Sequence, residues 1–162
     1  MYFPKRKMNL CGGVFNVAER RHNARLDRAL RELGRETVLP QREALRFLKD
    51  GVLDLDRVAL ACQQAARDEK NILVLNLDGP DADGGGAVEY GIAIERTGRA
   101  ITYRTDIRTA PEKELGRNAM FRLPVTEFIH IPCYSVEELE TEAFYRKLAE
   151  EIENAAHRLN LR

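Results

Sequence analysis

Three aspartates and one glutamate stand close together around a run of glycines in the middle of the chain. The stretch NLDGPDADGGGAVEYG, residues 76–91, holds Asp78, Asp81, Asp83, a glycine run that ends at Gly86, and Glu89. An ionised carboxylate can attack an electrophilic carbon and form a covalent ester, as in retaining glycosyl transfer. Glycines let a substrate approach the backbone closely. We therefore treat Glu89 as a candidate nucleophile and Asp83 as a candidate ligand for hydroxyl groups.

Purely structural roles for the same residues stay open. Asp83 is placed to cap a helix or form a turn, and acidic residues such as Glu89 are common in the first turn of a helix. Asp78, just past a strand, can bond a loop amide or touch a ligand. A Mg²⁺ site built from the three aspartates is an alternative, although no phosphate-binding basic group accompanies them. The glycines match neither GxxxxGK[ST] nor GxGxxG, which argues against a nucleotide phosphate loop.

The composition suits one soluble domain that spans residues 1–162. The chain is 44% hydrophobic and 32% charged, with 26 basic and 26 acidic residues, so nothing demands a nucleic acid or a membrane as partner. Cys11, Cys62 and Cys133 are far apart and form no CxxC pair, which argues against disulfides and a zinc site. We expect a cytoplasmic protein without a bound metal or cofactor.

Apolar runs alternate with helical patterns along the chain. The run at 72–77 predicts a central strand buried on both faces, with further strands at 8–11, 36–39, 100–103 and 125–131. Strands that alternate with helices predict a parallel sheet between two helical layers. We therefore predict an α/β, flavodoxin-like three-layer sandwich with a five-stranded sheet and the first strand central. This order brings the turn with Gly13 and Phe15 beside the acidic loop.

The expected helices run from Asn16 to a stop at Gly34, over 42–49, over 56–68 and over 87–96. Asp50-Gly51 is expected to be a turn. The helix at 56–68 should bury one apolar face, formed by Val58, Ala61, Cys62, Ala65 and Ala66. The segment ERRHNARLDR, residues 19–28, predicts an exposed helix face with ion pairs. Ser135 and Glu138 form a predicted capping box before a final helix, whose apolar stripe is Tyr145, Leu148, Ile152, Ala155 and Leu159.

Four stretches resemble the nucleoside 2-deoxyribosyltransferases. They are GGVFNVAERRHNARL near the start, LDGPDADGGGAVEYGIA in the middle, YRTDIR after the fourth expected strand, and GRNAM, which ends at Met120. The resemblance implies a flavodoxin-like fold, a dimer or hexamer, and exchange of the base of 2′-deoxynucleosides by double displacement without a cofactor. The implied partners are small-molecule deoxynucleosides and free nucleobases.

The resemblance also implies residue roles. Glu89 matches the nucleophile, Asp83 the aspartate that binds sugar hydroxyls, and Asn118 an asparagine that a neighbouring subunit supplies. Asn9 stands where many members have a tyrosine that bonds the nucleophile. Gln63 stands where members often carry an aspartate that handles the base proton, and an amide cannot protonate a base.

Arg104, Asp106 and Arg108 fall on a stretch that members often share, and a loop ion pair is the simple alternative for them. Our leading expectation for the whole chain is base exchange on 2′-deoxynucleosides. The alternatives are an N-glycoside hydrolase that uses water, a non-catalytic nucleoside-binding module, and a flavodoxin-type protein with a phosphate-containing cofactor.

Overall fold

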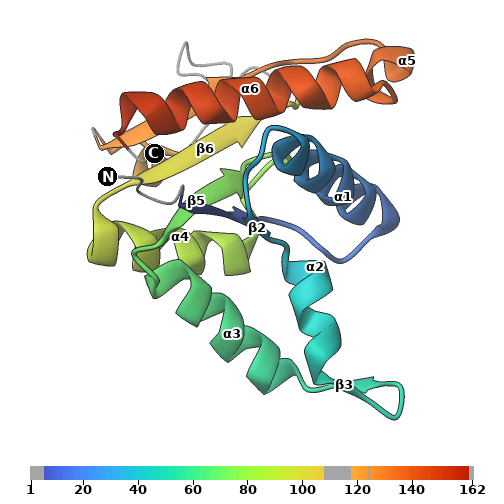
Figure 1. The fold of residues 1–162 in the computed structure, drawn as a ribbon, viewed down its shortest axis with the longest axis vertical. Helices are drawn as coiled ribbons and strands as arrows, with labels where there is room; N and C mark the ends of the chain where they lie inside the picture. Colours follow the sequence, from blue (N-terminus) through green and yellow to red (C-terminus); the bar gives the residue numbers. More distant parts are fainter. Residues whose placement is uncertain (1–5, 108–117, 124, 161–162) are drawn as a thin grey trace.

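The core of the protein is a parallel β-sheet (Figure 1). The computed structural model describes residues 6–107, 118–123 and 125–160. The five strands lie in the order β2-β1-β5-β6-β7, and each neighbouring pair is parallel. They are β1 (Lys7–Cys11), β2 (Thr37–Val38), β5 (Asn71–Asn76), β6 (Ala100–Arg104) and β7 (Thr126–His130). The predicted flavodoxin-like α/β class is confirmed, with β5 rather than the first strand in the middle.

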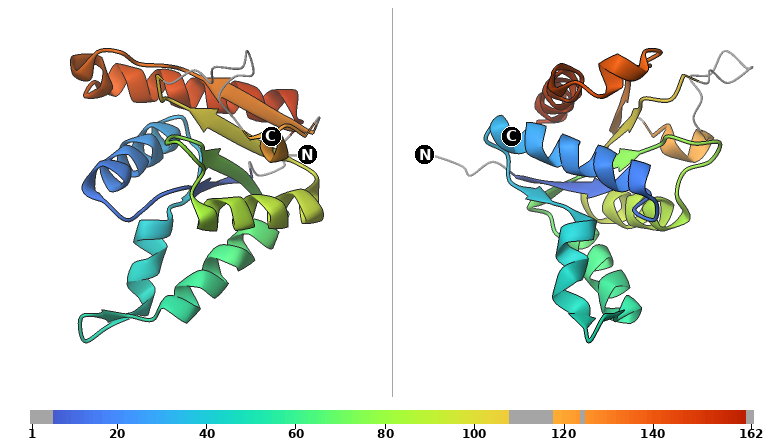
Figure 2. Two further views of the ribbon diagram at one scale, coloured as in Figure 1. Left: turned by 180° about the vertical axis from the view of Figure 1, so that it is seen from behind. Right: turned by 90° about the vertical axis from the view of Figure 1, so that its right-hand side faces the viewer.

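Helices cover both faces of the sheet (Figure 2). Helices α1 (Val17–Glu32) and α6 (Glu142–Arg158) share one hydrophobic core with the sheet, and α4 (Gly84–Thr97) shares the other. Helix α3 (Leu55–Arg67) packs beside α4. Strand β5 alternates between the two cores: Val74 belongs to the first and Leu75 to the second. Its continuous apolar run is therefore buried on both faces, as predicted.

The segment between β2 and α3 projects from the body of the molecule (Figure 2) and differs from the single helix predicted over 42–49. It contains α2 (Pro40–Glu43), the 3-10 helix η1 (Ala44–Phe47), and a hairpin of β3 (Leu48–Lys49) and β4 (Val52–Leu53). Asp50 and Gly51 form the predicted turn, with φ of 51° and 79°. Two successive positive φ values are typical of turns that pair antiparallel strands, which explains why a hairpin replaces the end of the helix.

The C-terminal region forms two helices rather than the single helix predicted. Ser135 caps the short helix α5 (Val136–Leu139) by accepting from the Glu138 amide, and Thr141 caps α6 separately. The Ser135 hydroxyl donates to the Glu137 carboxylate, so only one half of the predicted capping box forms. The predicted apolar stripe of α6 is buried, apart from its last residue Leu159, which is half-buried.

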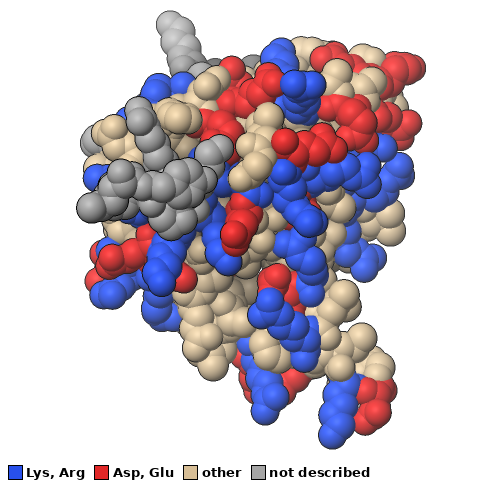
Figure 3. All heavy atoms as spheres, in the orientation of Figure 1, with Lys and Arg blue, Asp and Glu red and all other residues tan. Residues whose placement is uncertain are grey.

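Basic residues on α1 lie against acidic residues of the C-terminal region. Figure 3 shows this as a blue band over α1 next to red atoms over α5 and α6. Arg28 pairs with Glu142 at 3.5 Å, and Arg21 pairs with Glu140 at 4.0 Å. The predicted ion pairs of α1 are present, and part of its positive charge is neutralised within the molecule. The segment 19–28 is not exposed throughout, because Asn23, Leu26 and Asp27 are buried. No helix in the described part of the chain is long and apolar enough to cross a membrane.

Candidate functional site

Two loops meet at the carboxyl edge of the sheet. Because β1 pairs in parallel with β5, the turn after Cys11 lies beside the loop that follows Asn76. Gly12 has a φ of +135°, and a Cβ there would lie 3.0 Å from the Cβ of Asn76. Only glycine fits this close approach without strain. The predicted juxtaposition of the first turn and the acidic loop is confirmed.

Helix α4 carries Glu89 over the edge of the sheet. It begins at Gly84, three residues earlier than predicted, because Asp83 caps it by accepting a 2.8 Å hydrogen bond from the Gly86 amide. Glu89 therefore lies in the second turn of the helix, and our expectation of a first-turn position was wrong. A Cβ on Gly86 would lie 2.8 Å from Cδ1 of Leu75. The absence of a side chain at Gly86 thus lets the start of α4 rest directly on β5.

Two polar side chains from β1 face Glu89. Burial has the largest effect on the pKa of the Glu89 carboxyl and raises it; the polar groups of Cys11 and Asn9 lower it, and the charge of Asp83 raises it further. The net shift of the Glu89 pKa is upward. Asn9 is only 2% exposed. Among the described residues, Nδ2 of Asn9 has no hydrogen-bond partner, and the same is true of Oε2 of Glu89. Both atoms keep bonding capacity for a ligand.

Cys62 on α3 also interacts with Glu89. Burial, and then the charge of Glu89, raise the pKa of the Cys62 thiol to about 11, so this thiol is neutral at physiological pH. Gln63, the next residue, accepts hydrogen bonds from Arg67 on its own helix instead. Sequence reasoning missed Cys11 and Cys62 because they belong to no recognisable motif. Cys11 on β1 and Cys62 on α3 are far apart in the sequence, so only the folded structure shows that both interact with Glu89.

Asp78 ties the two neighbouring loops together. Its Oδ1 accepts from the Thr105 and Asp106 amides at 2.6 and 2.8 Å, and its Oδ2 accepts from the Thr105 hydroxyl at 2.7 Å. Asp106 in turn accepts from the Gly79 amide and pairs with Arg104 at 3.5 Å. Of the two alternatives left open for Asp78, the bond to a loop amide is the one present. The ion pair that was the simple alternative for Arg104 and Asp106 is present, while Arg108 lies outside the described residues.

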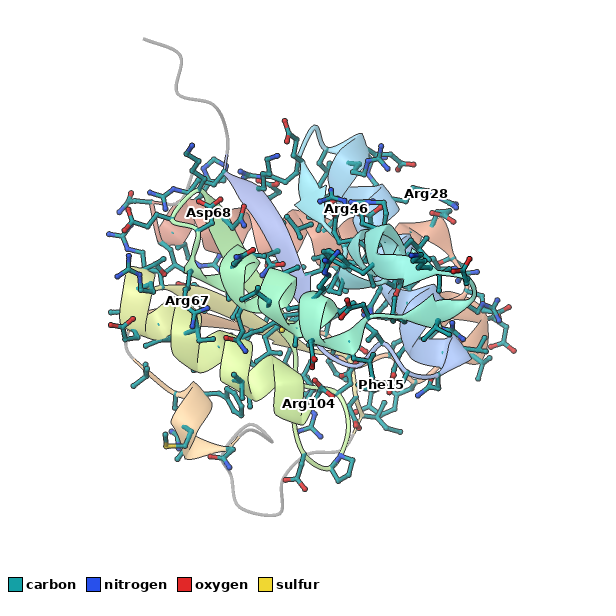
Figure 4. The ribbon with its side chains drawn as sticks, turned by 90° about the horizontal axis from the view of Figure 1, so that it is seen from below. Phe15, Arg28, Arg46, Arg67, Asp68 and Arg104 are labelled. Atoms are coloured by element: carbon teal, nitrogen blue, oxygen red, sulfur yellow. The ribbon has the colours of Figure 1, made fainter. Side chains whose placement is uncertain are left out.

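The turn after β1 places Phe15 at the same edge (Figure 4). The Glu19 carboxylate accepts from the amides of Phe15 and Asn16, and it fills the space where a side chain on Gly13 would lie. The Gly13 carbonyl accepts from the Asn23 side chain. This fixed turn leaves the ring of Phe15 78% exposed. An exposed aromatic ring on a rigid turn offers a flat surface for stacking.

Asn118 stands at the start of a short helix of its own. It is exposed and caps the 3-10 helix η2 (Ala119–Phe121) by accepting from the Met120 amide. Phe121 packs edge-on against Tyr90 of α4, with ring centroids 5.0 Å apart, and so fixes η2 beside that helix. In the part of the chain that the structure describes, no hydrogen bond joins Asn118 to Glu89.

A cavity of about 640 Å³ opens between the α2–η1 segment and α3. Its lining includes Asn9 and Cys62, the two side chains that also interact with Glu89, and apolar groups such as Phe47. The face of α3 that we expected to be buried borders this cavity. Of its five residues only Ala66 is fully buried; Val58, Ala61, Cys62 and Ala65 are half-buried.

Metal binding finds little support in this geometry. Within residues 6–107, 118–123 and 125–160, no three His, Cys, Asp or Glu side chains converge as ligands. Asp78, one of the three aspartates considered for Mg²⁺, already accepts three hydrogen bonds from its neighbours.

Comparison with known proteins places these observations in a family. The family profile described as "Nucleoside 2-deoxyribosyltransferase" matches residues 9–120, which include Asn9, Asp83, Glu89 and Asn118. The chain belongs to this family. A similar solved structure, "Crystal structure of conserved protein from Enterococcus faecalis V583", is 24% identical, with a TM-score of 0.64. The match covers 93% of this chain and 99% of that one, and it supports the fold. No curated protein matches the chain significantly.

Proposed function

We propose that the protein transfers the 2-deoxyribosyl group between nucleobases by double displacement, with Glu89 as nucleophile. The observation that carries the proposal is the Glu89 carboxylate itself. It lies at the carboxyl edge of a parallel sheet, where α/β proteins bind ligands, and its buried Oε2 has no hydrogen-bond partner among the described residues. A buried carboxylate without a full set of partners is costly for the fold and is typical of functional sites.

The proposed reaction has two steps. Glu89 attacks the anomeric carbon, the bond from that carbon to the base nitrogen breaks, and a glycosyl ester forms. A second base then attacks the ester and releases Glu89. Two displacements at one carbon retain its configuration. Cys11 and Asn9 favour the ionised form of the Glu89 carboxyl, and Asp83, whose Oδ2 caps α4, presents Oδ1 to a sugar hydroxyl.

Asn118 is proposed to serve the site of a neighbouring copy in a homo-oligomer. Its exposure leaves it accessible to a partner, and the packing of Phe121 on Tyr90 fixes its position relative to α4. Mixing Glu89→Gln subunits with Asn118→Ala subunits tests this role. Mixed oligomers should regain activity that neither variant shows alone, because some sites then combine an intact Glu89 with an intact Asn118. Failure to regain activity in proven mixed oligomers would contradict the shared site.

A chromatographic assay tests the transferase activity directly. The purified protein is incubated with thymidine or 2′-deoxyguanosine, with and without adenine. Deoxyadenosine formed together with the released base supports transfer, whereas free deoxyribose without a new nucleoside indicates hydrolysis. Binding without base release would favour a binding module.

The matched variants are Glu89→Gln and Glu95→Gln. Glu95 is exposed on the same helix, so its substitution should leave turnover unchanged. Glu89→Gln should abolish turnover and keep the fold, because the amide has nearly the same shape but is a poor nucleophile. Unchanged turnover in Glu89→Gln would rule out the proposed mechanism.

A further inference from the structure

Four carboxylates at the carboxyl edge of the sheet are held as hydrogen-bond acceptors. Backbone amides donate to each of four carboxylates at this edge: Glu19, Asp78, Asp83 and Asp106. A carboxylate oxygen that accepts an amide hydrogen cannot donate a proton along the same direction. These four groups therefore act as acceptors at this edge.

The groups from α3 are also poor proton donors to a leaving base. Efficient general acid catalysis needs a pKa near the working pH. The pKa of the Cys62 thiol, raised to about 11, is too high for this purpose, and the Gln63 amide has no acidic proton. His22 is on the opposite face of the sheet, where its ring nitrogens bond to Tyr103 and Tyr145.

The same edge is electrostatically suited to a cation. Arg104 contributes positive charge there, but its guanidinium is engaged by Asp106 and by the Gly79 carbonyl. The exposed ring of Phe15 lies at this edge too (Figure 4). An aromatic face and nearby carboxylates both attract a flat, positively charged heterocycle. The unpaired Nδ2 of Asn9 adds a hydrogen-bond donor next to the nucleophile.

We propose that the preferred substrates are N-glycosides whose base is a cation, with a quaternised ring nitrogen, so that the base leaves as a neutral molecule. This inference rests on the proposed function of Glu89. As the new bond forms between Oε of Glu89 and the anomeric carbon, the electron pair of the breaking bond moves to the ring nitrogen and neutralises its charge. No proton is transferred.

The second half-reaction also proceeds without proton transfer. A neutral base of the pyridine or imidazole type attacks the ester carbon with a ring-nitrogen lone pair, and Glu89 leaves as a carboxylate. The new nucleoside is again a cation, so charge and atoms balance without an acid or a base from the protein. A preference for such acceptors is therefore expected alongside the preference for cationic donors.

A matched pair of donors tests the inference: 7-methyl-2′-deoxyguanosine and 2′-deoxyguanosine. They share the sugar and the purine frame and differ in one methyl group and one positive charge. The assay is run at mildly acidic pH, where the methylated base keeps its charge, and the rate with Glu89→Gln is subtracted. We expect kcat/KM for the methylated donor to be higher by about 100-fold or more, the scale of a missing general acid.

Binding provides a second readout that does not depend on turnover. Calorimetry with Glu89→Gln should show tighter binding of the methylated donor, and added salt should reduce the difference. Asp81→Asn serves as a control because Asp81 is exposed on the loop, and it should leave the preference for the methylated donor in place.

The outcomes separate this inference from the proposed function. Values of kcat/KM within about tenfold of each other, or equal affinities in the binding assay, would overturn the cationic-base inference while Glu89-dependent turnover stands. If neither donor nor thymidine reacts in a Glu89-dependent way, the proposed function fails, and this inference fails with it.

Discussion

At the scale of single residues, the proposed chemistry depends on how β1 presents its side chains to Glu89. Asn9 and Cys11 are two residues apart, so both point to the same face of the sheet. Each lowers the pKa of the Glu89 carboxyl, while burial raises it. The Asn9 amide group therefore favours the ionised form of the carboxyl. In the proposed reaction, Asn9 is a positioning residue rather than a chemical participant.

Substitution of Asn9 should move the acid limb of the pH–rate profile. Glu89 must be ionised to attack, so activity rises with pH through its raised pKa. Asn9→Leu removes a donor that favours the ionised form, and Asn9→Asp adds a nearby negative charge. The midpoint of the limb should therefore increase in the order wild type, Asn9→Leu, Asn9→Asp. Profiles of kcat/KM against pH measure this order, and a limb that stays in place in both variants would refute the role of Asn9.

At the scale of elements, the contact between the start of α4 and β5 determines how far Glu89 lies from the sheet. Three consecutive glycines occupy this start, but they are not equivalent. A Cβ on Gly86 would lie 2.8 Å from Leu75, whereas a Cβ on Gly84 would meet no atom within 4 Å. Only the last glycine is required for the close approach of helix and strand.

This difference predicts opposite effects of two alanine substitutions. Gly86→Ala should destabilise the protein by about 1–3 kcal/mol through overpacking, and it should reduce kcat because Glu89 moves with the helix. Gly84→Ala should be neutral or slightly stabilising, since alanine favours helix over glycine. Denaturant unfolding and steady-state kinetics on both variants test the claim. Equal effects of the two substitutions would show that the packing of α4 on β5 does not control the site.

At the scale of the whole molecule, a half-buried hydrogen-bonded group links three elements on the face opposite to α4. His22 of α1 lies between Tyr103 of β6 and Tyr145 of α6, at 2.9 and 3.2 Å. Burial lowers the pKa of His22, and the charge of Asp78 opposes this effect only in part. His22 is therefore less readily protonated in the folded protein than in the unfolded chain.

The stability of the fold should consequently fall in mild acid. Below the ordinary pKa of histidine the unfolded chain binds a proton that the folded protein does not, so the free energy of unfolding decreases as pH falls. His22→Phe should weaken this part of the pH dependence, whereas His157→Gln, an exposed control, should retain it. Urea unfolding between mildly acidic and neutral pH measures both. An unchanged pH dependence in His22→Phe would contradict the assignment.

Sequence and structure agree most closely where hydrophobic patterning dominates. The run at 72–77 predicted a strand buried on both faces, and the expected strand order predicted that the glycine turn and the acidic loop meet at one edge. The hairpin at 48–53 was missed because its strands have only two residues each, too short for a periodic signal. The role of Asp78 as a bond between loops depends on amides at 105 and 106, which only the register of β5 and β6 brings into reach.

The central claim is that Glu89 forms a covalent bond with the sugar, and mass spectrometry of the acid-quenched enzyme tests it most directly. The protein is mixed with a 2′-deoxynucleoside without an acceptor base, quenched, and digested. The account predicts a deoxyribosyl adduct on the peptide that contains Glu89, absent in Glu89→Gln, together with retained configuration in the transfer product. Full turnover with no adduct and with inverted configuration would mean a single displacement and would contradict the account.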